Sequence, residues 1–462
     1  MRRKNTTVQI KNSAILKRSA RATGSLASAL ILFATANVAQ AGSGVFPSAE
    51  PKLAKDLSQL MKIDERVIAA RQSLNAARSG KKQAFSVFLP NLSFSSDYGR
   101  EVIDSPSGRT SGLDEQRETR RKATLTLTQN LFSGGSNSAS FETSSKQVEL
   151  ADLNLASTKS SVLLEGLLTY FSLVRDKKLL DLASRAEVFT KEQLELENEK
   201  VEKGKGIALD ILQAKSRLQL ATQRKIQFKG QLDLATTQFT YLFKFRPVLA
   251  AQDDPKVDLP KVPSSLDGAL SIALKNSAAL SAAQTNVDVT KLGIDSAQAG
   301  FWPQIDLETT VNYEKDAGAV KGIRRDWSVL LKATWTLFDG FGTYHGAKSA
   351  RSNYAASLSQ LDASKRQVKT ELITSFQRLK TAGENRELME NGLRIAEEIV
   401  SARERMEKAG KETSINTLDA QSQLIDAKIS YTSAFYDHLL AGLSVIFNMG
   451  LLTADDLSLG SE

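Results

Sequence analysis

The stretch WSVLLKATWTLFDG, residues 327–340, joins a strand pattern to the start of a long helix pattern. Apolar residues occupy every second position up to Trp335, with mostly polar residues between them, which is the period of a strand with two different faces. The closing Leu-Phe-Asp-Gly recurs as Leu-Phe-Ser-Gly at residues 131–134, after the alternating stretch ATLTLTQN at residues 123–130. The chain therefore contains the same junction between a strand and a helix twice.

Two other landmarks repeat with this junction. The pair Lys203-Gly204 lies 206 residues before Ala409-Gly410, which is also the spacing of the two Leu-Phe motifs. A proline motif precedes each strand pair, as FLPNL at residues 88–92 and as FWPQI at residues 301–305, and its two copies are 213 residues apart. The larger spacing places extra residues between the strands of the first copy, where we expect a tolerant, exposed loop. The sequence thus predicts two internal repeats.

The repeats and the chain ends give the predicted organisation. We expect a signal peptide over 1–41, a first repeat over 42–250, a linker over 251–265, a second repeat over 266–455 and a C-terminal tail over 456–462. Each repeat would contain a leading helix, a strand pair at about 88–132 or 302–338, and a long helical hairpin. No proline occurs in residues 107–246 or 304–462, and its absence permits very long helices.

Helical periodicity fills the second part of each repeat. Mostly apolar or small residues, with Gln193 as the exception, recur at steps of four and three from Leu182 to Leu196, and the same steps recur from Leu388 to Ala402. Charged residues separate them, which is the heptad pattern of a coiled coil. The first long helix, about residues 136–203, would be roughly 100 Å long at ~1.5 Å per residue. We expect it to turn back at its glycine pair, as its counterpart does at the second pair.

Residues 1–41 are typical of a secretory signal. They hold seven basic residues and no acidic one, then an apolar run over 26–38, then Ala39-Gln40-Ala41. The apolar run is shorter than the ~20 residues that a helix needs to cross a bilayer. An N-terminal membrane anchor and a disordered tail are the alternatives, and the long basic segment leaves a downstream start codon open.

Composition excludes several classes of site and partner. The chain has no cysteine and two histidines far apart, so we expect no disulfide, no metal centre and no cofactor. Its net charge of +9 falls to +2 without residues 1–41, because that segment takes seven of the 61 basic residues and leaves 54 against 52 acidic ones. The basic excess is therefore no argument for a nucleic-acid partner.

The four predicted strands fit an outer-membrane β-barrel, whose strands of ~9–11 residues are apolar on one face and polar on the other. The alternative for each pair is an ordinary hairpin packed on a soluble core. Four strands cannot close a barrel, and an open sheet edge in lipid leaves backbone groups unpaired at several kcal/mol each. Closure therefore demands several protomers. Three would supply twelve strands, although the strand pattern does not fix the number three.

Four features occur in a fixed order in both halves: the duplication itself, the proline motif at the entry to the strands, the Leu-Phe-[Ser/Asp]-Gly motif at their exit, and the glycine-containing hairpin turns. In these features the chain resembles the outer-membrane efflux proteins of the TolC type over essentially all of 42–455. The resemblance implies a mainly α fold with a β-barrel part: a homotrimer with a shared 12-stranded barrel in outer-membrane lipid and a long α-helical barrel in the periplasm. It also implies a periplasmic adaptor (membrane fusion protein), an inner-membrane transporter and a passive conduit that performs no catalysis.

The same resemblance implies where the periplasmic aperture lies. In the family, two acidic residues six and nine positions beyond the second tip glycine surround it, and these positions here are Asn416 and Asp419. Only Asp419 is acidic, so a trimer would carry half the usual carboxylates and bind cations more weakly. Asp210, six residues beyond Gly204, matches an acid that anchors the links holding the tips shut.

The family's partners for that acid are a tyrosine and an arginine, but Glu407 and Glu412 occupy their positions. Carboxylates facing Asp210 would repel it, so the familiar lock is not expected. Nearby lysines are candidates for different pairs: Lys203, Lys205, Lys408 and Lys411. The turns themselves are the expected adaptor surface, and the residues assigned to it are Lys203, Gly204, Lys205, Gly206, Gly410, Lys411 and Glu412.

Two other classes of protein are alternatives to an outer-membrane exit duct. A coiled-coil scaffold of the cell envelope explains the heptads and the leader but not the paired strands. A secreted enzyme could draw on the many carboxylates for acid–base chemistry, but no phosphate loop, serine elbow or metal-spaced cluster occurs in the sequence. The cargo of a duct, whether drug, metal, metabolite or protein, is not encoded in these motifs.

Overall fold

The computed structural model describes residues 51–110, 112, 115–247, 262–318 and 320–453. The predicted signal peptide, residues 251–261 of the predicted linker and the predicted tail lie outside the described residues. Their limits, and those of the two repeats, stay predictions.

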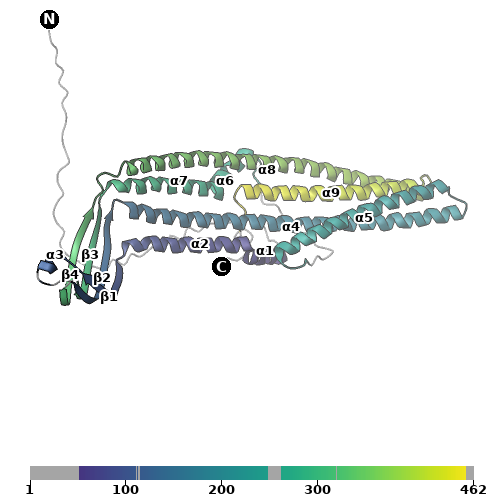
Figure 1. The fold of residues 1–462 in the computed structure, drawn as a ribbon. Coiled ribbons are helices and arrows are strands. Elements are labelled where there is room, and N and C mark those ends of the chain that lie inside the picture. The colour runs from purple at the N-terminus through teal and green to yellow at the C-terminus, as the bar shows by residue number, and fades with distance from the viewer. Residues whose placement is uncertain (1–50, 111, 113–114, 248–261, 319, 454–462) are drawn as a thin grey trace, which may run out of the picture. The chain divides into compact units, whose positions relative to one another are not determined.

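Apart from α3, which lies between the strands of the first half, the two halves of the chain contain the same elements in the same order (Figure 1). The first half holds α1 (Pro51–Ile63), α2 (Glu65–Phe85), η1 (Ser86–Phe88), β1 (Asn91–Ile103), α3 (Pro106–Thr110), β2 (Gln116–Ser133), α4 (Ser136–Glu202) and α5 (Ala208–Phe243). The second holds α6 (Leu266–Asn276), α7 (Ala278–Gln298), η2 (Ala299–Phe301), β3 (Gln304–Ala317), β4 (Val320–Thr334), α8 (Gly342–Lys408) and α9 (Ser414–Asn448). The predicted fold class, mainly α with two repeats and four strands, is confirmed. No helix of the described residues is both long and apolar enough to pass through a membrane.

Both halves contribute to one antiparallel sheet in the order β1-β2-β3-β4. Strands β2 and β3 pair from Arg121 opposite Lys315 to Ser133 opposite Gln304, and this ladder joins the halves. Within the described residues, β1 and β4 each have a strand on one side only. The sheet therefore ends in two open edges.

One face of this sheet is apolar and uncovered. A row of apolar side chains crosses all four strands at one level: Phe94, Leu125, Val311 and Trp327. All four are exposed, and Trp327 is 75% accessible. Soluble monomers rarely expose a continuous apolar face, so this face is built to meet an apolar surrounding or a partner.

The exit motif is a helix cap, which explains its third residue. The hydroxyl of Ser133 accepts a hydrogen bond from the backbone N–H of Asn137 at 3.1 Å. In the second copy, Asp339 Oδ2 accepts bonds from the backbone N–H (2.6 Å) and the hydroxyl (2.5 Å) of Thr343. These bonds satisfy donors that the first turn of α4 or α8 leaves unpaired. They also hold the pKa of Asp339 below its usual range.

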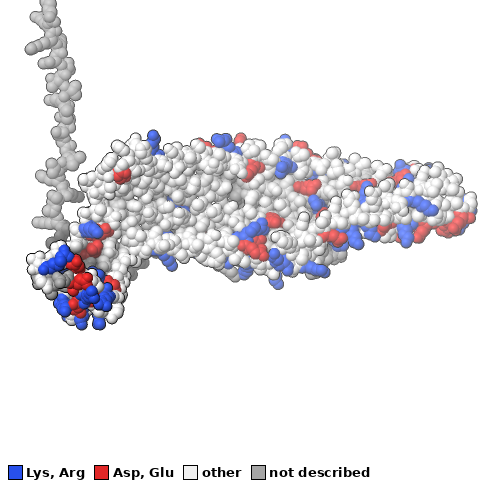
Figure 2. Space-filling model, viewed as in Figure 1, with Lys and Arg blue, Asp and Glu red and all other residues white. Residues whose placement is uncertain are grey.

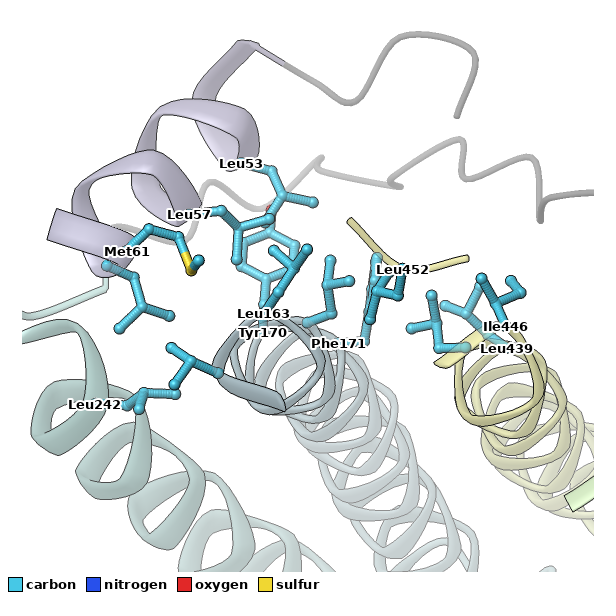
Figure 3. Close-up of a cluster of buried hydrophobic side chains, with 14 of the residues drawn as sticks. Leu53, Leu57, Met61, Leu163, Tyr170, Phe171, Leu242, Leu439, Ile446 and Leu452 are labelled. Atoms are coloured by element: carbon cyan, nitrogen blue, oxygen red, sulfur yellow. The ribbon is translucent and has the colours of Figure 1, made fainter. Parts of the chain in front are cut away.

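A buried cluster fixes α1, α5 and α9 around α4 (Figure 3). Leu57 of α1, Phe171 of α4 and Ile446 of α9 are almost completely buried in it. The approach of α1 to α4 depends on Gly166, where a Cβ would lie 2.8 Å from Leu60 Cδ2 and 3.0 Å from Leu57 Cδ2. A larger residue here would push these leucine side chains from their buried positions.

We expect Gly166→Leu to lower the free energy of unfolding by about 1–3 kcal/mol, because overpacking forces the core side chains from their positions. Gly80→Leu in α2 is the matched control, since a Cβ at Gly80 meets no atom within 4 Å. Denaturant midpoints of the two variants provide the measurement. Equal midpoints would contradict the assigned role of Gly166.

Candidate gate at the helical tips

The two tip turns have the same geometry. In the first, Gly204 has φ +72° and the N–H of Lys205 donates to the carbonyl of Lys200 at 2.9 Å. In the second, Gly410 has φ +70° and the N–H of Lys411 donates to the carbonyl of Met406 at 2.9 Å. This bond across a left-handed glycine is the Schellman ending of a helix. Both helical hairpins therefore turn back at the predicted glycines.

Glu412 organises the second turn. Its Oε1 accepts from Asn416 Nδ2 at 2.5 Å and from the backbone N–H of Thr413 at 3.1 Å, and its Oε2 lies 3.5 Å from Arg403 NH1. The Asn416 amide is the main cause that lowers the pKa of Glu412. Asn416 thus serves to hold the turn in the single chain, in a position where the family resemblance implies an acid.

A carboxyl with a lowered folded pKa stabilises the folded form above its unfolded pKa and loses that contribution as the pH falls through the folded value. We therefore expect the second tip turn to loosen below about pH 4, the unfolded range of a glutamate. Amide hydrogen exchange at residues 410–417, corrected for the intrinsic rate, measures this. Glu412→Gln should loosen the turn already at pH 7 and remove its pH dependence, and an unchanged profile would contradict this role.

The other predicted tip residues lie at or near the surface. Lys203 pairs with Glu199 of its own helix, while Lys205, Lys408 and Lys411 are exposed. Glu407 and Asp210 are half-buried, and Asp210 has no ion-pair partner within the part of the chain that the structure describes. A Cβ at Gly206 would approach Val201 Cγ2 at 2.9 Å, so the first turn also needs a small residue there.

Asp419 of α9 forms an ion pair that joins the two hairpins. Its Oδ1 lies 2.8 Å from Arg217 NH2 of α5. One heptad further along both helices, Arg224 NH1 of α5 pairs with Asp426 Oδ1 of α9. We call these two pairs the tip ladder. It neutralises the predicted aperture acid within one protomer.

Sequence reasoning missed three members of the ladder, namely Arg217, Arg224 and Asp426. The available signal was the spacing: two arginines seven residues apart on one helix and two aspartates seven apart on another. Residues seven apart lie on the same face of a helix in a coiled coil. The sequence alone does not say which helix faces which, so the match stayed hidden.

A cavity of about 140 Å³ lies beside the ladder, between α4, α5 and α9. Small and apolar side chains line much of it, among them Ala183, Ala186, Ala214, Ala221, Leu220 and Ile425. The interior of a protein is normally packed as densely as a crystal of small organic molecules. Beside this cavity, partly exposed ion pairs join the hairpins, whereas the buried cluster around α4 packs them closely elsewhere.

Comparison with known proteins agrees with this architecture. The family described as outer membrane efflux protein matches residues 57–242 and 269–446. The alkaline protease secretion protein AprF of Pseudomonas aeruginosa is 24% identical over 405 residues, covering 86% of this chain and 84% of AprF. The outer membrane protein TolC of Vibrio cholerae is 22% identical over 437 residues, covering 93% of this chain and 96% of TolC.

Solved structures share the fold. The outer membrane channel CmeC of Campylobacter jejuni superposes with a TM-score of 0.71 at 16% identity, covering 87% of this chain and 86% of CmeC. The open state of the outer membrane channel MtrE of Neisseria gonorrhoeae gives a TM-score of 0.71 at 16% identity, covering 88% of this chain and 90% of MtrE.

Proposed function

The chain belongs to the outer membrane efflux protein family, and from this premise we propose that three copies assemble into one conduit with its gate at the helical tips. It is an outer-membrane exit duct for efflux or type I secretion. The observation that carries the assembly is the sheet, which has an exposed apolar face and two open edges; the number three follows from the family resemblance. Neighbouring copies would pair these edges and so close a barrel in which no backbone group faces lipid unpaired.

The helices support the same assembly. The heptad stripe of the first copy is half-buried in α4 apart from the exposed Leu196, whereas Leu388 and Ile395 of the matching stripe in α8 are 63% and 53% exposed. Helix α5 also exposes apolar residues, including Leu212 and Ile226. An uncovered apolar stripe on each outer helix is what a neighbouring copy would bury.

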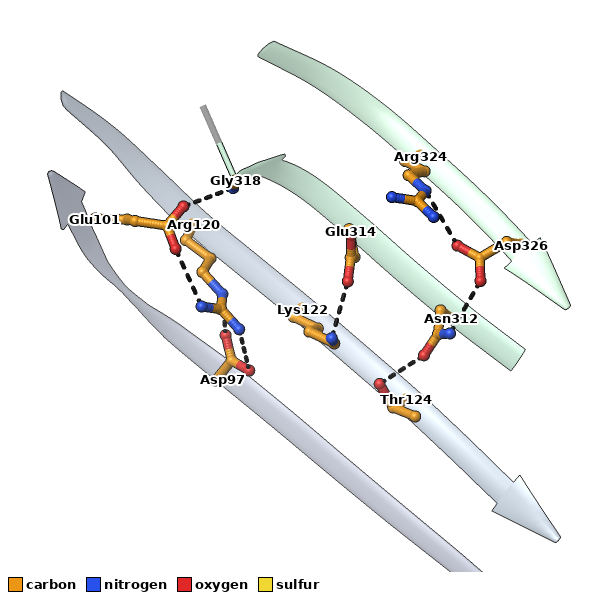
Figure 4. A network of polar contacts seen from close by, with 10 residues as sticks. All are labelled: Asp97, Glu101, Arg120, Lys122, Thr124, Asn312, Glu314, Gly318, Arg324 and Asp326. Atoms are coloured by element: carbon orange, nitrogen blue, oxygen red, sulfur yellow. Dashed lines mark hydrogen bonds and ion pairs between the residues drawn. The ribbon is translucent and has the colours of Figure 1, made fainter. Parts of the chain in front are cut away.

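The polar face of the sheet would line the water-filled passage (Figure 4). Arg120 pairs with Asp97 at 3.0 Å and with Glu101 at 3.1 Å, and Lys122 pairs with Glu314 at 2.9 Å. Such satisfied charges suit a hydrated lumen, while the apolar face meets lipid. The energy for transport would come from an inner-membrane transporter, reached through a periplasmic adaptor that binds the tip turns.

At the tips, we assign the resting gate to the ladder. Asp419 is neutralised by Arg217, and Asn416 carries no charge, so the closed aperture would attract cations weakly. Asp210, Glu407 and Lys408 remain candidates for contacts between copies. The coiled-coil scaffold stays the second candidate, but it gives no reason for the exposed apolar sheet face.

Planar lipid bilayers test this function. The mature chain should run as a heat-sensitive trimer and give discrete channel currents. Leu388→Asp with Ile395→Asp should abolish trimers and currents together, because it places charges in the proposed interface. Glu390→Lys on α8, an exposed charge change outside the stripe, should leave both intact. A mature protein that stays a soluble monomer without currents would refute the proposal.

A further inference from the structure

The apolar face of the sheet ends in a group of basic residues at the end remote from the long helices. Arg121 and Lys315 lie directly opposite each other on β2 and β3, level with Tyr98 of β1. One level nearer the helices, Arg325 of β4 lies opposite Tyr313 of β3. Arg100 follows Tyr98 at the next position on this face of β1. We call these four cations the outer basic belt: Arg100, Arg121, Lys315 and Arg325.

The outer basic belt has no acidic partner within the described residues. Arg121 and Arg325 instead lie over aromatic rings, 5.5 Å from the centre of Tyr98 and 5.7 Å from that of Tyr313. Arg117 and Lys321, closer to the strand ends, do have acids, at Glu115 and Glu118. Figure 2 shows charges of both signs gathered at this end of the strands, next to a mostly uncharged surface.

The opposite face of the same strands is built differently. There, each basic residue drawn in Figure 4 has a carboxylate: Arg120 has Asp97, Lys122 has Glu314, and Arg324 has Asp326 at 3.3 Å. Like charges directly opposite on neighbouring strands destabilise a sheet. Arg121 and Lys315 lie opposite each other without a carboxylate partner. An anion from outside the chain would therefore stabilise this face by neutralising their repulsion.

We propose that the outer basic belt binds the phosphate groups of an anionic lipid in the outward leaflet. This inference rests on the proposed function, which places the apolar face in a membrane. The belt begins one level beyond the row that contains Trp327, ~7 Å along the strand, and aromatic residues of a membrane protein lie at the level of the lipid headgroups. Guanidinium groups bind phosphate oxygens in a bidentate manner, and Lys315 adds a point charge.

Vesicles test the belt. The trimer is reconstituted into phosphatidylcholine with a diphosphorylated glycolipid (lipid A), or with the same lipid lacking both phosphates, and retained lipid is counted by native mass spectrometry. The wild type should bind the phosphorylated form preferentially and dissociate at a higher temperature in it. The triple variant Arg121→Gln, Lys315→Gln, Arg325→Gln should bind it on the order of a hundredfold more weakly, from ~5-fold for each cation.

The matched control removes three cations from the other face of the same strands: Lys122→Gln, Arg324→Gln, Lys332→Gln. It should retain the preference of the wild type. Equal loss in both triple variants, or equal binding of the dephosphorylated lipid, would overturn the proposal. Full competition by excess inorganic phosphate would assign the belt to free phosphate instead. Channel currents are recorded in parallel: currents without lipid preference refute the belt alone, whereas absent wild-type currents refute the proposed function.

Discussion

Arg217→Glu combined with Arg224→Glu is expected to raise the resting current of the channel strongly. Both ladder pairs are partly exposed, with side chains 34% to 48% accessible, so each contributes only about 0.5 kcal/mol. A trimer would hold both pairs three times, so losing them shifts the gate by ~3 kcal/mol, on the order of a hundredfold in the open fraction. Repulsion between the new glutamates and the aspartates adds to this effect.

Lys225→Glu is the control for this experiment. Lys225 is adjacent to Arg224 but pairs with Glu187 of α4 at 2.5 Å, within one hairpin. It should therefore leave the resting current low. A variant that exchanges the charges of one pair, Arg217→Asp with Asp419→Arg, should keep the ion pair and therefore keep the resting current low. The double glutamate variant should also gain block by divalent cations, because Asp419 is released. A low current in that variant would show that the ladder does not hold the gate.

Gly134→Ala is expected to prevent assembly, with a loss of at least ~3 kcal/mol in folding free energy. Gly134 has φ +65°, and an added Cβ would lie 2.4 Å from the carbonyl oxygen of Ala299 and 2.9 Å from Trp302 Cβ. That carbonyl already accepts the N–H of Trp302 at 3.0 Å, so it is not free to move. The junction between β2 and α4 would have to separate from η2.

The internal repeat supplies the control. Gly340 is the counterpart of Gly134 in the second exit motif and has φ +68°, but a Cβ there meets no atom within 4 Å. Gly340→Ala should therefore lower the free energy of unfolding by only ~1–2 kcal/mol, the cost of placing a residue with a Cβ in the left-handed conformation. The yield of heat-sensitive trimers and the denaturant midpoint distinguish the variants. Equal losses would mean that conformation alone, and not the contact with Ala299, requires glycine.

Local rules predicted much of this fold. The second-copy strand pattern predicts a strand that reaches about Phe338, but β4 ends earlier, at Thr334, before the exit motif at residues 337–340. The tip glycines were predicted by position, and both adopt the left-handed conformation that ends a helix. The turn prediction succeeded because it depends on residues that are close in sequence and therefore close in space.

Contacts between distant segments were not predictable in the same way. The pairing of β2 with β3 and the pairing of Arg217 with Asp419 each join residues about two hundred positions apart. Register and partner there depend on how the helices pack, which no single periodicity encodes. Asp419 could be placed at the aperture from its spacing to Gly410, but its ion pair could not be predicted, because Arg217 lies on another hairpin.

The two copies of the heptad stripe differ in exposure. That of α4 is half-buried within its own chain apart from Leu196, and that of α8, with the exposed Leu388 and Ile395, would be buried by a neighbour in the proposed trimer. Damage in α4 would harm only the polypeptide that carries it. A defect in α8 that still permitted partial association would have a dominant-negative effect. In a cell that makes both normal and defective chains, few trimers would contain normal subunits alone. Genetic dominance in merodiploid cells would thus follow the repeat in which a lesion falls.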